Sequence, residues 1–329
     1  MKPRAAGRPA GDFVCVANVC FINDFRIDDH TVVITGATSG LGHACAGVLA
    51  APGRTVVVAA RDPGRGAQAA RELQDATPGA RVVSLPLDLA DLASVRAFPA
   101  VLGNAGLPPL RAIVANAGVQ HRDRRHESAQ GYEATFAVNH LGHFLLLRLL
   151  LGDLAPGGRI VIVASGTHKD QRVRNLGFPP PRWRDARALA TPGPGSGQVA
   201  YATSKLANVM TMLELARRLE TLRPGAGIAV HALDPGLMPD TGLDRDYPPR
   251  AQRLYDAIAP LLVRVVPGAT TSAASAAQLA RMAVDPAFAA PSGRYVELDH
   301  DGTPSAQARD PALAAALWTA SEELVALSR

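Results

Sequence analysis

The chain has 329 residues, of which 47% are hydrophobic, 5% aromatic and 19% charged, with a formal net charge of +5. These apolar residues are sufficient for a large core and exclude a polar, disordered chain. The basic excess is almost all arginine and is scattered, with its densest cluster at 121–125. It lacks the interleaved aromatic residues of single-strand binders, so we expect no nucleic-acid partner.

The three cysteines, Cys15, Cys20 and Cys45, all lie in the first fifth of the chain. An odd number without paired spacing argues against a disulfide scaffold and a zinc site, and favours a reducing compartment. No apolar run reaches the roughly twenty residues that span a bilayer. The weakly apolar segment 13–22 lacks a signal-peptide cleavage site. We therefore expect a cytoplasmic protein without a membrane span.

Residues 1–29 combine proline, glycine and charge and are expected to form an extension outside the main fold. From residue 30 onward, β-branched apolar runs alternate with glycine or proline breaks and helical patterns. The runs cover 31–35, 55–59, 81–85, 112–115, 159–163, 228–233 and 293–297. Because they are continuous rather than alternating, both faces of each strand should be buried, as in a parallel sheet.

The intervening helical segments include 40–51, 63–76, 128–151 and 199–222. Repeated strand–helix–strand units predict one α/β domain over 30–329, with a doubly wound, mostly parallel, seven-stranded sheet and helices on both faces.

Two stretches, about 170–198 and 240–267, interrupt this alternation after strand ends, where ligands bind in such sheets. We interpret them as lid insertions. Apolar residues of the second stretch, such as Leu254 and Ile258, favour a bulky lipophilic substrate. They are equally consistent with ordinary packing onto the sheet.

A glycine-rich turn joins the first predicted strand to the first helix. Glycines at positions 36, 40 and 42 permit a tight turn and let backbone N–H groups approach a pyrophosphate. Glycine is common in any such turn, but this turn also has the position that a dinucleotide motif requires. The sequence predicts cofactor contacts at Gly36, Thr38, Ser39, Gly40, Leu41 and Gly42.

Two further strand ends carry candidate cofactor contacts. Arg61 lies just beyond the second strand, where a guanidinium suits a ribose 2′-phosphate and so favours NADP over NAD. The alternative is a solvated loop arginine beside Asp62. After the third strand, Asp88 with Leu89 either contacts the adenine or caps the helix that begins near Asp91.

The fourth strand ends at Asn116, Ala117 and Gly118, whose small side chains would let a cofactor lie against the backbone. Asn116 is either a ligand contact or a structural bridge between strands.

Tyr201 and Lys205 are four residues apart on a predicted helix, which places both side chains on one face. An ammonium beside a phenol favours the phenolate and lowers the pKa of the tyrosine towards a useful range for acid–base chemistry. Lys205 is one of only three lysines in an arginine-rich chain, with Lys2 and Lys169. A lysine rather than an arginine at this position suggests that the site needs a compact ammonium.

Ser165 ends the fifth strand, where its hydroxyl could donate to a carbonyl oxygen as negative charge develops. Asn139 lies inside a predicted helix, where it either bonds an internal water or carbonyl, or faces the sheet by chance. His140 and His143 have no cysteine or carboxylate partner nearby, so packing is favoured over metal binding. We expect no metal.

These motifs, in this order, resemble the short-chain dehydrogenase/reductase family over residues 30–300. The resemblance implies a Rossmann-like sheet and a catalytic tetrad of Asn139, Ser165, Tyr201 and Lys205. It implies that the tyrosine is the acid–base and that the lysine tunes it and binds ribose. The serine would orient the carbonyl, and the asparagine would hold a proton-relay water.

Segments 139–144, 204–208 and 304–310 resemble the retinol dehydrogenase and protochlorophyllide reductase branch. Pro235, Gly236 and Thr241 resemble that branch's nicotinamide-end segment. Here Asp234 replaces the usual His before Pro-Gly, and Thr241 lies one residue late. The chain also lacks a cysteine after Cys45, unlike the light-dependent reductases, and its first thirty residues do not resemble an N-terminal anchor.

The sequence therefore predicts an NADP(H)-dependent oxidoreductase that transfers a hydride to or from the carbonyl or alcohol of a bulky, lipophilic small-molecule substrate. Two alternatives are a carbon–carbon double-bond reductase of the same family and a non-catalytic NADP-binding regulator. The helix that contains Tyr201 serves as a subunit interface in such enzymes, which leaves a homodimer and a homotetramer open.

Overall fold

The computed structural model describes residues 13–16, 19–22, 29–171, 177–238 and 269–327. Its main sheet has eight strands: β3 (His30–Thr35), β4 (Arg54–Ala60), β5 (Arg81–Pro86), β6 (Leu110–Ala115), β7 (Leu154–Val163), β8 (Ala229–Asp234), β9 (Tyr295–Glu297) and β10 (His300–Asp301).

The helices predicted over 40–51, 63–76 and 199–222 are present, and further helices lie between the strands. The helices of the described residues are α1 (Gly40–Leu49), α2 (Pro63–Ala76), α3 (Leu92–Asn104), α4 (Ala134–Phe136), α5 (His143–Leu150), α6 (Ala186–Ala190), α7 (Gly197–Leu222), α9 (Ser272–Val284) and α10 (Pro311–Leu324). A π-helical turn, η1 (Ala137–Gly142), and the 3₁₀ turns η2 (Gly166–His168) and η4 (Pro286–Phe288) complete the set.

The strand order is β10-β9-β8-β7-β6-β3-β4-β5, and all pairs are parallel except β10 with β9. The doubly wound α/β fold is confirmed, with one strand more than the seven predicted. The extra strand is the two-residue β10, which is too short to leave a pattern in the sequence.

The order reverses between β3 and β6, which are neighbours in the sheet but distant in the chain. In doubly wound sheets ligands bind beyond the carboxyl ends of the strands at such a reversal. The glycine-rich turn after β3 and the Asn116 segment after β6 therefore meet at the expected edge.

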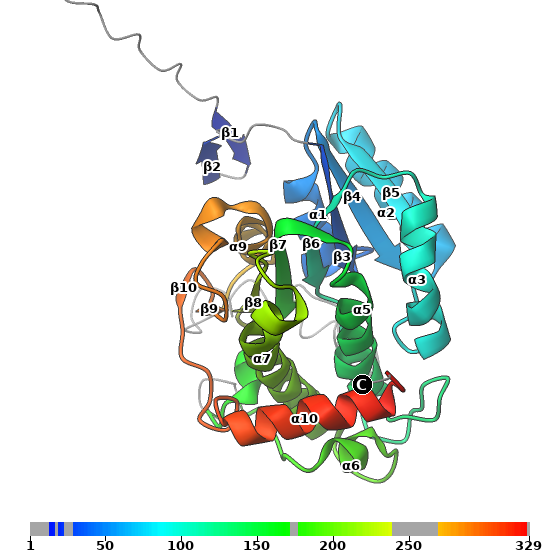
Figure 1. The fold of residues 1–329 in the computed structure, drawn as a ribbon, viewed down its shortest axis with the longest axis vertical. Helices are drawn as coiled ribbons and strands as arrows, with labels where there is room; N and C mark the ends of the chain where they lie inside the picture. The colour runs from blue at the N-terminus through cyan, green and yellow to red at the C-terminus, as the bar shows by residue number, and fades with distance from the viewer. Residues whose placement is uncertain (1–12, 17–18, 23–28, 172–176, 239–268, 328–329) are drawn as a thin grey trace, which may run out of the picture.

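Two hydrophobic clusters cover the two faces of the sheet. One contains residues of α3, α5, α7 and α10, and the other contains residues of α1, α2 and α9. Figure 1 shows α5 and α7 in front of the central strands. Successive residues of one strand belong to opposite clusters, as Val32 and Val33 do. This explains why the strand sequences are continuously apolar.

The helix predicted over 128–151 begins later and is not uniform. Residues 128–132 form a turn in which Ser128 N donates to the Tyr132 carbonyl. Glu133 then caps the helix by accepting from Phe136 N at 2.6 Å. The π-helical turn η1 follows before α5. Such turns are rare and occur often at functional sites, and this one contains Asn139.

Helix α7 is buried along most of its length, and α10 packs against it (Figure 1). The exposed residues of α7 are Arg217, Glu220 and Thr221.

Within the predicted N-terminal extension, β1 (Phe13–Val16) and β2 (Val19–Ile22) form a separate two-stranded antiparallel sheet. The second predicted lid, with its apolar residues, lies outside the described residues. The described part of the first lid is ordered around α6, because Arg124 Nη2 donates to the carbonyls of Ala188, Leu189 and Thr191. Among the helices of the described residues, none is long and apolar enough to cross a membrane.

Candidate functional site

The glycine-rich turn after β3 forms a closely packed cradle. Gly36 has φ of +67°, and a Cβ there would lie 2.8 Å from Ala117 Cα. A Cβ on Gly42 would lie 2.4 Å from both Asn116 Nδ2 and the Gly36 carbonyl oxygen. Helix α1 begins at Gly40 and has no acidic residue in its first turn. The turn therefore suits a pyrophosphate, which would bind to backbone N–H groups at the N-terminus of α1.

Thr35 joins the end of β3 to the end of β6. Its buried Oγ1 accepts hydrogen bonds from the backbone N–H groups of Asn116 and Ala117, each at 3.0 Å. In return, Asn116 Nδ2 donates to the carbonyls of Thr35 at 2.9 Å and Gly36 at 3.3 Å. The Asn116 side chain thus bridges the strands, which is the structural alternative from the sequence.

Asn139 anchors the π-helical turn to the loop after β6. Its Oδ1 accepts from Val119 N at 2.8 Å, and its Nδ2 donates to the Val119 carbonyl at 3.0 Å. Nδ2 also donates to Ser204 Oγ on α7 at 3.0 Å. A Cβ on Gly118 would lie 3.5 Å from Asn139 Oδ1 and 3.7 Å from Lys205 Nζ. The structure therefore brings Gly118, Asn139 and Lys205 together.

Tyr201 and Lys205 lie on one face of α7, with the Lys205 Nζ 5.5 Å from the centre of the Tyr201 ring. Lys205 Nζ donates to the Val163 carbonyl at 2.9 Å. The side chain of Ser165 is near enough to that of Tyr201 to act on the pKa of its hydroxyl. Both residues of α7 are almost fully buried, at 8% and 3% exposure. Tyr201, Lys205 and Ser165 therefore lie together at the end of β7.

Burial controls the ionisation of this pair. Burial raises the pKa of the Tyr201 hydroxyl above its usual value, and the charge of Asp234 raises it further, while the hydrogen bond with Ser165 opposes both. The expected lowering of this pKa is therefore not met, since desolvation is the largest cause of the shift. Burial lowers the pKa of Lys205 to about 8, and Asp234 opposes that shift.

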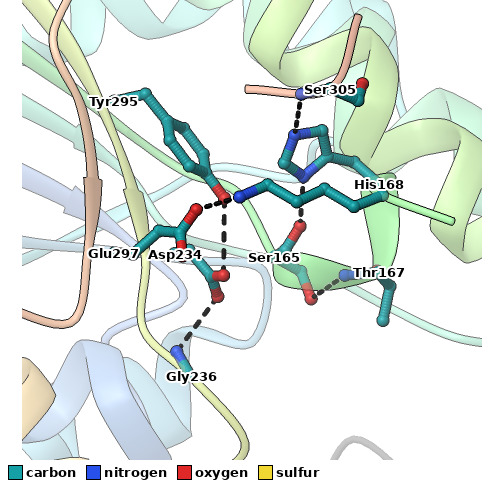
Figure 2. A network of polar contacts seen from close by, with 9 residues as sticks. Ser165, Thr167, His168, Asp234, Gly236, Tyr295, Glu297 and Ser305 are labelled. Atoms are coloured by element: carbon teal, nitrogen blue, oxygen red, sulfur yellow. Dashed lines mark hydrogen bonds and ion pairs between the residues drawn. The ribbon is translucent and has the colours of Figure 1, made fainter. Parts of the chain in front are cut away.

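A polar network beside Ser165 includes residues that the sequence did not single out (Figure 2). Asp234 accepts hydrogen bonds from Gly236 N at 3.0 Å and from the Tyr295 hydroxyl at 3.4 Å. Lys169 forms an ion pair with Glu297 and lies 5.0 Å from the Tyr295 ring.

His168 fixes the peptide of Ser165. The carbonyl of Ser165 accepts from His168 Nδ1 at 2.7 Å, and Ser305 N donates to His168 Nε2 at 3.2 Å (Figure 2). These partners require the neutral ring with its proton on Nδ1. Burial lowers the pKa of His168 to about 4, which agrees with that form.

The remaining predicted cofactor contacts lie at strand ends along the same edge. Arg61 is exposed just beyond β4, while Asp62 caps α2 by accepting from Arg65 N at 3.0 Å. Asp88 Oδ1 accepts from Ala90 N at 2.9 Å, and the cap of α3 is Asp91. The helix-cap alternative for Asp88 is therefore wrong. Leu89 is buried.

Pro235 and Gly236 follow β8 directly. The Pro235 carbonyl accepts from Ser275 Oγ at 2.7 Å, and Gly236 has φ of +79°. Thr38 and Ser39 lie in the turn before α1. Thr241 lies outside the described residues.

Phe178, from the first predicted lid, approaches the site. Its ring meets the Tyr201 ring edge-on, with centroids 6.0 Å apart. A further contact fixes this segment, because Arg182 N donates to Thr203 Oγ1 on α7 at 3.0 Å. An aromatic side chain from the insertion thus lies against the predicted acid–base residue.

The two histidines near Asn139 have protein partners. His140 Nε2 lies 2.8 Å from Ser321 Oγ, and His143 Nε2 lies 2.9 Å from Thr35 Oγ1. Across the described part of the chain, no group of three or more His, Cys, Asp or Glu side chains is arranged to hold a metal ion.

Sequence reasoning assigned no site role to four residues that lie in these contacts. His143 stands four residues after Asn139, a spacing that could have suggested a contact within one helix. Asp234 was noted only as a departure from the usual histidine. His168 and Tyr295 left no local signal, since their partners come from distant segments.

Comparisons with known proteins agree with this geometry. The family model described as short chain dehydrogenase matches residues 30–176. A protochlorophyllide reductase of Avena sativa is 37% identical over 322 residues, covering 90% of this chain and 100% of that protein. Retinol dehydrogenase 14 of Mus musculus is 36% identical over 314 residues, covering 90% of this chain and 86% of that protein.

Solved structures show the same fold. An uncharacterised protein from Mycobacterium paratuberculosis superposes with a TM-score of 0.62 at 30% identity, covering 90% of this chain and 93% of that one. An angucycline C-6 ketoreductase with bound NADP superposes with a TM-score of 0.60 at 22% identity, covering 82% and 94%.

Proposed function

The chain belongs to the short-chain dehydrogenase family, and we propose that it is an NADP(H)-dependent oxidoreductase that interconverts a carbonyl and an alcohol. The convergence of Tyr201, Lys205 and Ser165 at the end of β7 carries this proposal, since Lys205 Nζ lies 5.5 Å from the centre of the Tyr201 ring and donates to the carbonyl of Val163, two residues before Ser165. It places a proton donor and a second hydroxyl together at one strand end, where both can address a single oxygen atom of a substrate.

The bound nicotinamide cofactor would supply or accept the hydride. Tyr201 would donate its hydroxyl proton to the substrate oxygen during reduction and recover a proton during oxidation. Since the pKa of Tyr201 is raised, the hydroxyl keeps its proton at neutral pH and suits the donor role. Ser165 would hold the same oxygen by a second hydrogen bond.

Lys205 and Asn139 would support this proton transfer. Lys205 Nζ is held by the Val163 carbonyl at 2.9 Å, next to the strand end that carries Ser165. With a pKa of about 8, its ammonium is charged at neutral pH and can bind a ribose hydroxyl. Asn139 fixes the π-helical turn through Val119, and its segment would hold a water for proton relay.

Several features support NADP as the cofactor. The tight cradle at Gly36 and Gly42 suits a pyrophosphate, because side chains are sterically excluded there. We propose that the exposed Arg61 binds the ribose 2′-phosphate and that Asp88, Leu89 and the 116–118 segment flank the adenosine. The ketoreductase with the related fold contains NADP. Pro235, Gly236 and Thr241 would contact the nicotinamide end.

We further propose a bulky lipophilic substrate. The Phe178 ring lies against Tyr201, so one wall beside the reacting oxygen is aromatic. A second reaction uses the same proton donor, namely reduction of a carbon–carbon double bond. It is supported by the 37% identity to a protein named protochlorophyllide reductase.

The test is a spectrophotometric assay of NADPH consumption with a panel of lipophilic ketones, aldehydes and enones. We expect turnover of at least one carbonyl with NADPH and much weaker activity with NADH. Product analysis with deuterated cofactor separates the two reactions, since deuterium appears on the carbinol carbon or on a former alkene carbon. Tight NADPH binding without turnover of any panel member would support the non-catalytic regulator instead.

A further inference from the structure

Ser165 stands at the start of the 3₁₀ turn η2, and this turn holds it through two of its oxygen atoms. The Oγ of Ser165 accepts from Thr167 N at 3.3 Å, and its carbonyl accepts from His168 N at 3.2 Å. A hydroxyl oxygen has two acceptor sites and one proton. The turn therefore uses the Ser165 hydroxyl as an acceptor and leaves its proton for another oxygen atom, as long as the turn keeps its shape.

The side chain of His168 closes this turn at its other end. Its Nδ1 donates to the Ser165 carbonyl at 2.7 Å. The ring and the backbone N–H of one residue thus fill both lone pairs of that carbonyl oxygen. Hydrogen-bond geometry is poorer in 3₁₀ turns than in α-helices, so the ring bond reinforces a weak backbone bond. It holds the first residue of the turn, which is Ser165, in place.

Two distant segments fix the orientation of the His168 ring. Ser305 N donates to Nε2 at 3.2 Å, and the Tyr295 ring meets the His168 ring edge-on with centroids 5.2 Å apart (Figure 2). Ser305 belongs to the segment 304–310, and its Oγ accepts from Ala308 N at 3.2 Å. His168 is only 1% exposed, so water does not compete for its two nitrogen atoms. The segment 304–310 therefore reaches the site through this ring.

We propose that His168 is a positioning residue whose ring holds the turn η2 so that the Ser165 hydroxyl faces the substrate oxygen. The segment 304–310 acts on the reaction through the same ring. This inference rests on the proposed function, in which Ser165 bonds that oxygen. His168 moves no proton in the reaction, because Nδ1 donates to a carbonyl and Nε2 accepts from a backbone N–H.

A buried histidine that only fills the core is the competing interpretation. Two substitutions separate the two roles, because each can keep one bond of the ring. In His168→Asn the amide nitrogen is bonded to Cγ, as Nδ1 is, and can donate to the Ser165 carbonyl. In His168→Gln the amide oxygen is one bond further from the backbone, as Nε2 is, and can accept from Ser305 N. Both variants lose the ring and its contact with Tyr295.

The measurement is kcat and KM for carbonyl reduction by the full chain with NADPH. His168→Gln should lower kcat about 10- to 100-fold, the cost of misplacing a donor to the reacting oxygen, with little change in KM or NADPH affinity. His168→Asn should keep most of the rate. His168→Gln added to Ser165→Ala should lower kcat no further than Ser165→Ala alone, because His168 acts only through that hydroxyl.

His231→Gln is the matched control for the loss of a buried histidine. His231 is also fully buried, its Nε2 lies 2.8 Å from the Phe288 carbonyl, and the Phe288 ring meets it edge-on. It pairs in register with Val161, four residues before Ser165 on β7. His231→Gln should lower the urea midpoint, as the His168 variants do, but should leave kcat unchanged.

A substrate-free check uses ¹⁵N NMR of the histidine side chains in the labelled chain with NADPH bound. The chain has nine histidines, and the resonances of His168 are those lost in both of its variants. They should show the neutral ring with its proton on Nδ1, because the bond to the Ser165 carbonyl selects that form. A proton on Nε2 instead would overturn the inference.

The kinetic outcomes are equally decisive in variants that bind NADPH normally. A rate for His168→Gln equal to that of the unaltered protein would overturn the inference, and so would equal losses in His168→Gln and His168→Asn. Additive effects of His168→Gln and Ser165→Ala would also overturn it. An unaltered protein that reduces no carbonyl would instead contradict the proposed function, and the inference with it, so the two failures are distinguished by the unaltered protein alone.

Discussion

The Nε2 of His143 lies 2.9 Å from the Oγ1 of Thr35, and this contact joins the start of α5, directly after the π-helical turn, to the end of β3. His143 Nδ1 donates to the Asn139 carbonyl at 3.2 Å, so Nε2 must accept the Thr35 hydroxyl proton. Burial lowers the pKa of His143 to about 4, which keeps the ring neutral. Asn139 and the cofactor cradle are therefore positioned by one continuous chain of hydrogen bonds.

Thr35→Val should weaken both the fold and NADPH binding. Valine has nearly the same shape but leaves the backbone N–H groups of Asn116 and Ala117 without their acceptor. Buried unsatisfied groups cost about 1–3 kcal/mol each, so we expect a loss of a few kcal/mol in the free energy of unfolding. The dissociation constant of NADPH should rise several-fold, as measured by fluorescence titration.

The matched control is Thr31→Val at the opposite end of the same strand, where the hydroxyl donates to the Pro108 carbonyl at 2.8 Å. It should lower stability in urea unfolding but leave NADPH affinity unchanged. Equal NADPH affinities for the two variants would contradict the role assigned to Thr35.

Two glycines of α1 provide a second matched pair. Gly42→Ala should destabilise the fold by about 1–3 kcal/mol and abolish tight NADPH binding, because the new Cβ would overlap Asn116 and Gly36. Gly47→Ala on the same helix meets only Leu73 Cδ2, at 3.4 Å. It should stabilise the helix by up to about 1 kcal/mol. Urea unfolding and NADPH titration test both, and normal cofactor affinity in Gly42→Ala would refute the cradle.

Buried histidines should make the fold sensitive to acid. Burial lowers the pKa of His140 to about 3 and those of His143 and His168 to about 4, against an ordinary value of 6.5. Their contribution is fully present above the unfolded value and is lost as pH falls from there towards the folded values. By linkage, each group costs about 2 kcal/mol of unfolding free energy between about pH 7.5 and pH 5.

The check is the urea midpoint at both pH values, in the unaltered protein and in His140→Gln, which removes one of the three contributions. The loss on acidification should be smaller in the variant by about a third of the combined effect of the histidines. Identical losses in the two proteins would show that His140 does not titrate on unfolding as described.

Arg61 should determine the preference for NADP. Arg61→Ser should raise the dissociation constant of NADPH about 10- to 100-fold, the value of a charged hydrogen bond, and leave that of NADH unchanged. Arg71→Ser, at an exposed position further along α2, is the control for a general loss of positive charge. If both variants weaken NADPH binding equally, the effect is long-range attraction rather than recognition of the 2′-phosphate.

Much of this arrangement was predictable because its determinants are local. Continuous apolar runs identified the parallel strands, since burial on both faces removes the alternation of an exposed strand. The spacing of Tyr201 and Lys205 placed them on one helix face, and their contact in the structure agrees with it. Gly36 precedes the first helix and Gly42 lies in its first turn, as a cofactor cradle requires.

Features that depend on distant partners were not predictable. Asp234 accepts a hydrogen bond from Tyr295, which is 61 residues away along the chain, and His168 is held by Ser305, 137 residues away. The π-helical turn at Asn139 differs from an α-helix by its hydrogen-bond pattern, which apolar periodicity does not reveal. The effect of burial on the pKa of Tyr201 likewise follows from packing that spacing alone does not show.

The proton-transfer role of Tyr201 is tested most directly by comparing the unaltered protein with Tyr201→Phe in single-turnover oxidation of NADPH by a carbonyl substrate. Phenylalanine keeps the ring against Phe178 and removes only the hydroxyl, so NADPH affinity should be retained. The rate should fall by about 10²- to 10⁴-fold, the usual contribution of a general acid. A variant that binds NADPH normally and reduces the carbonyl at the unaltered rate would contradict the proposed function of this site.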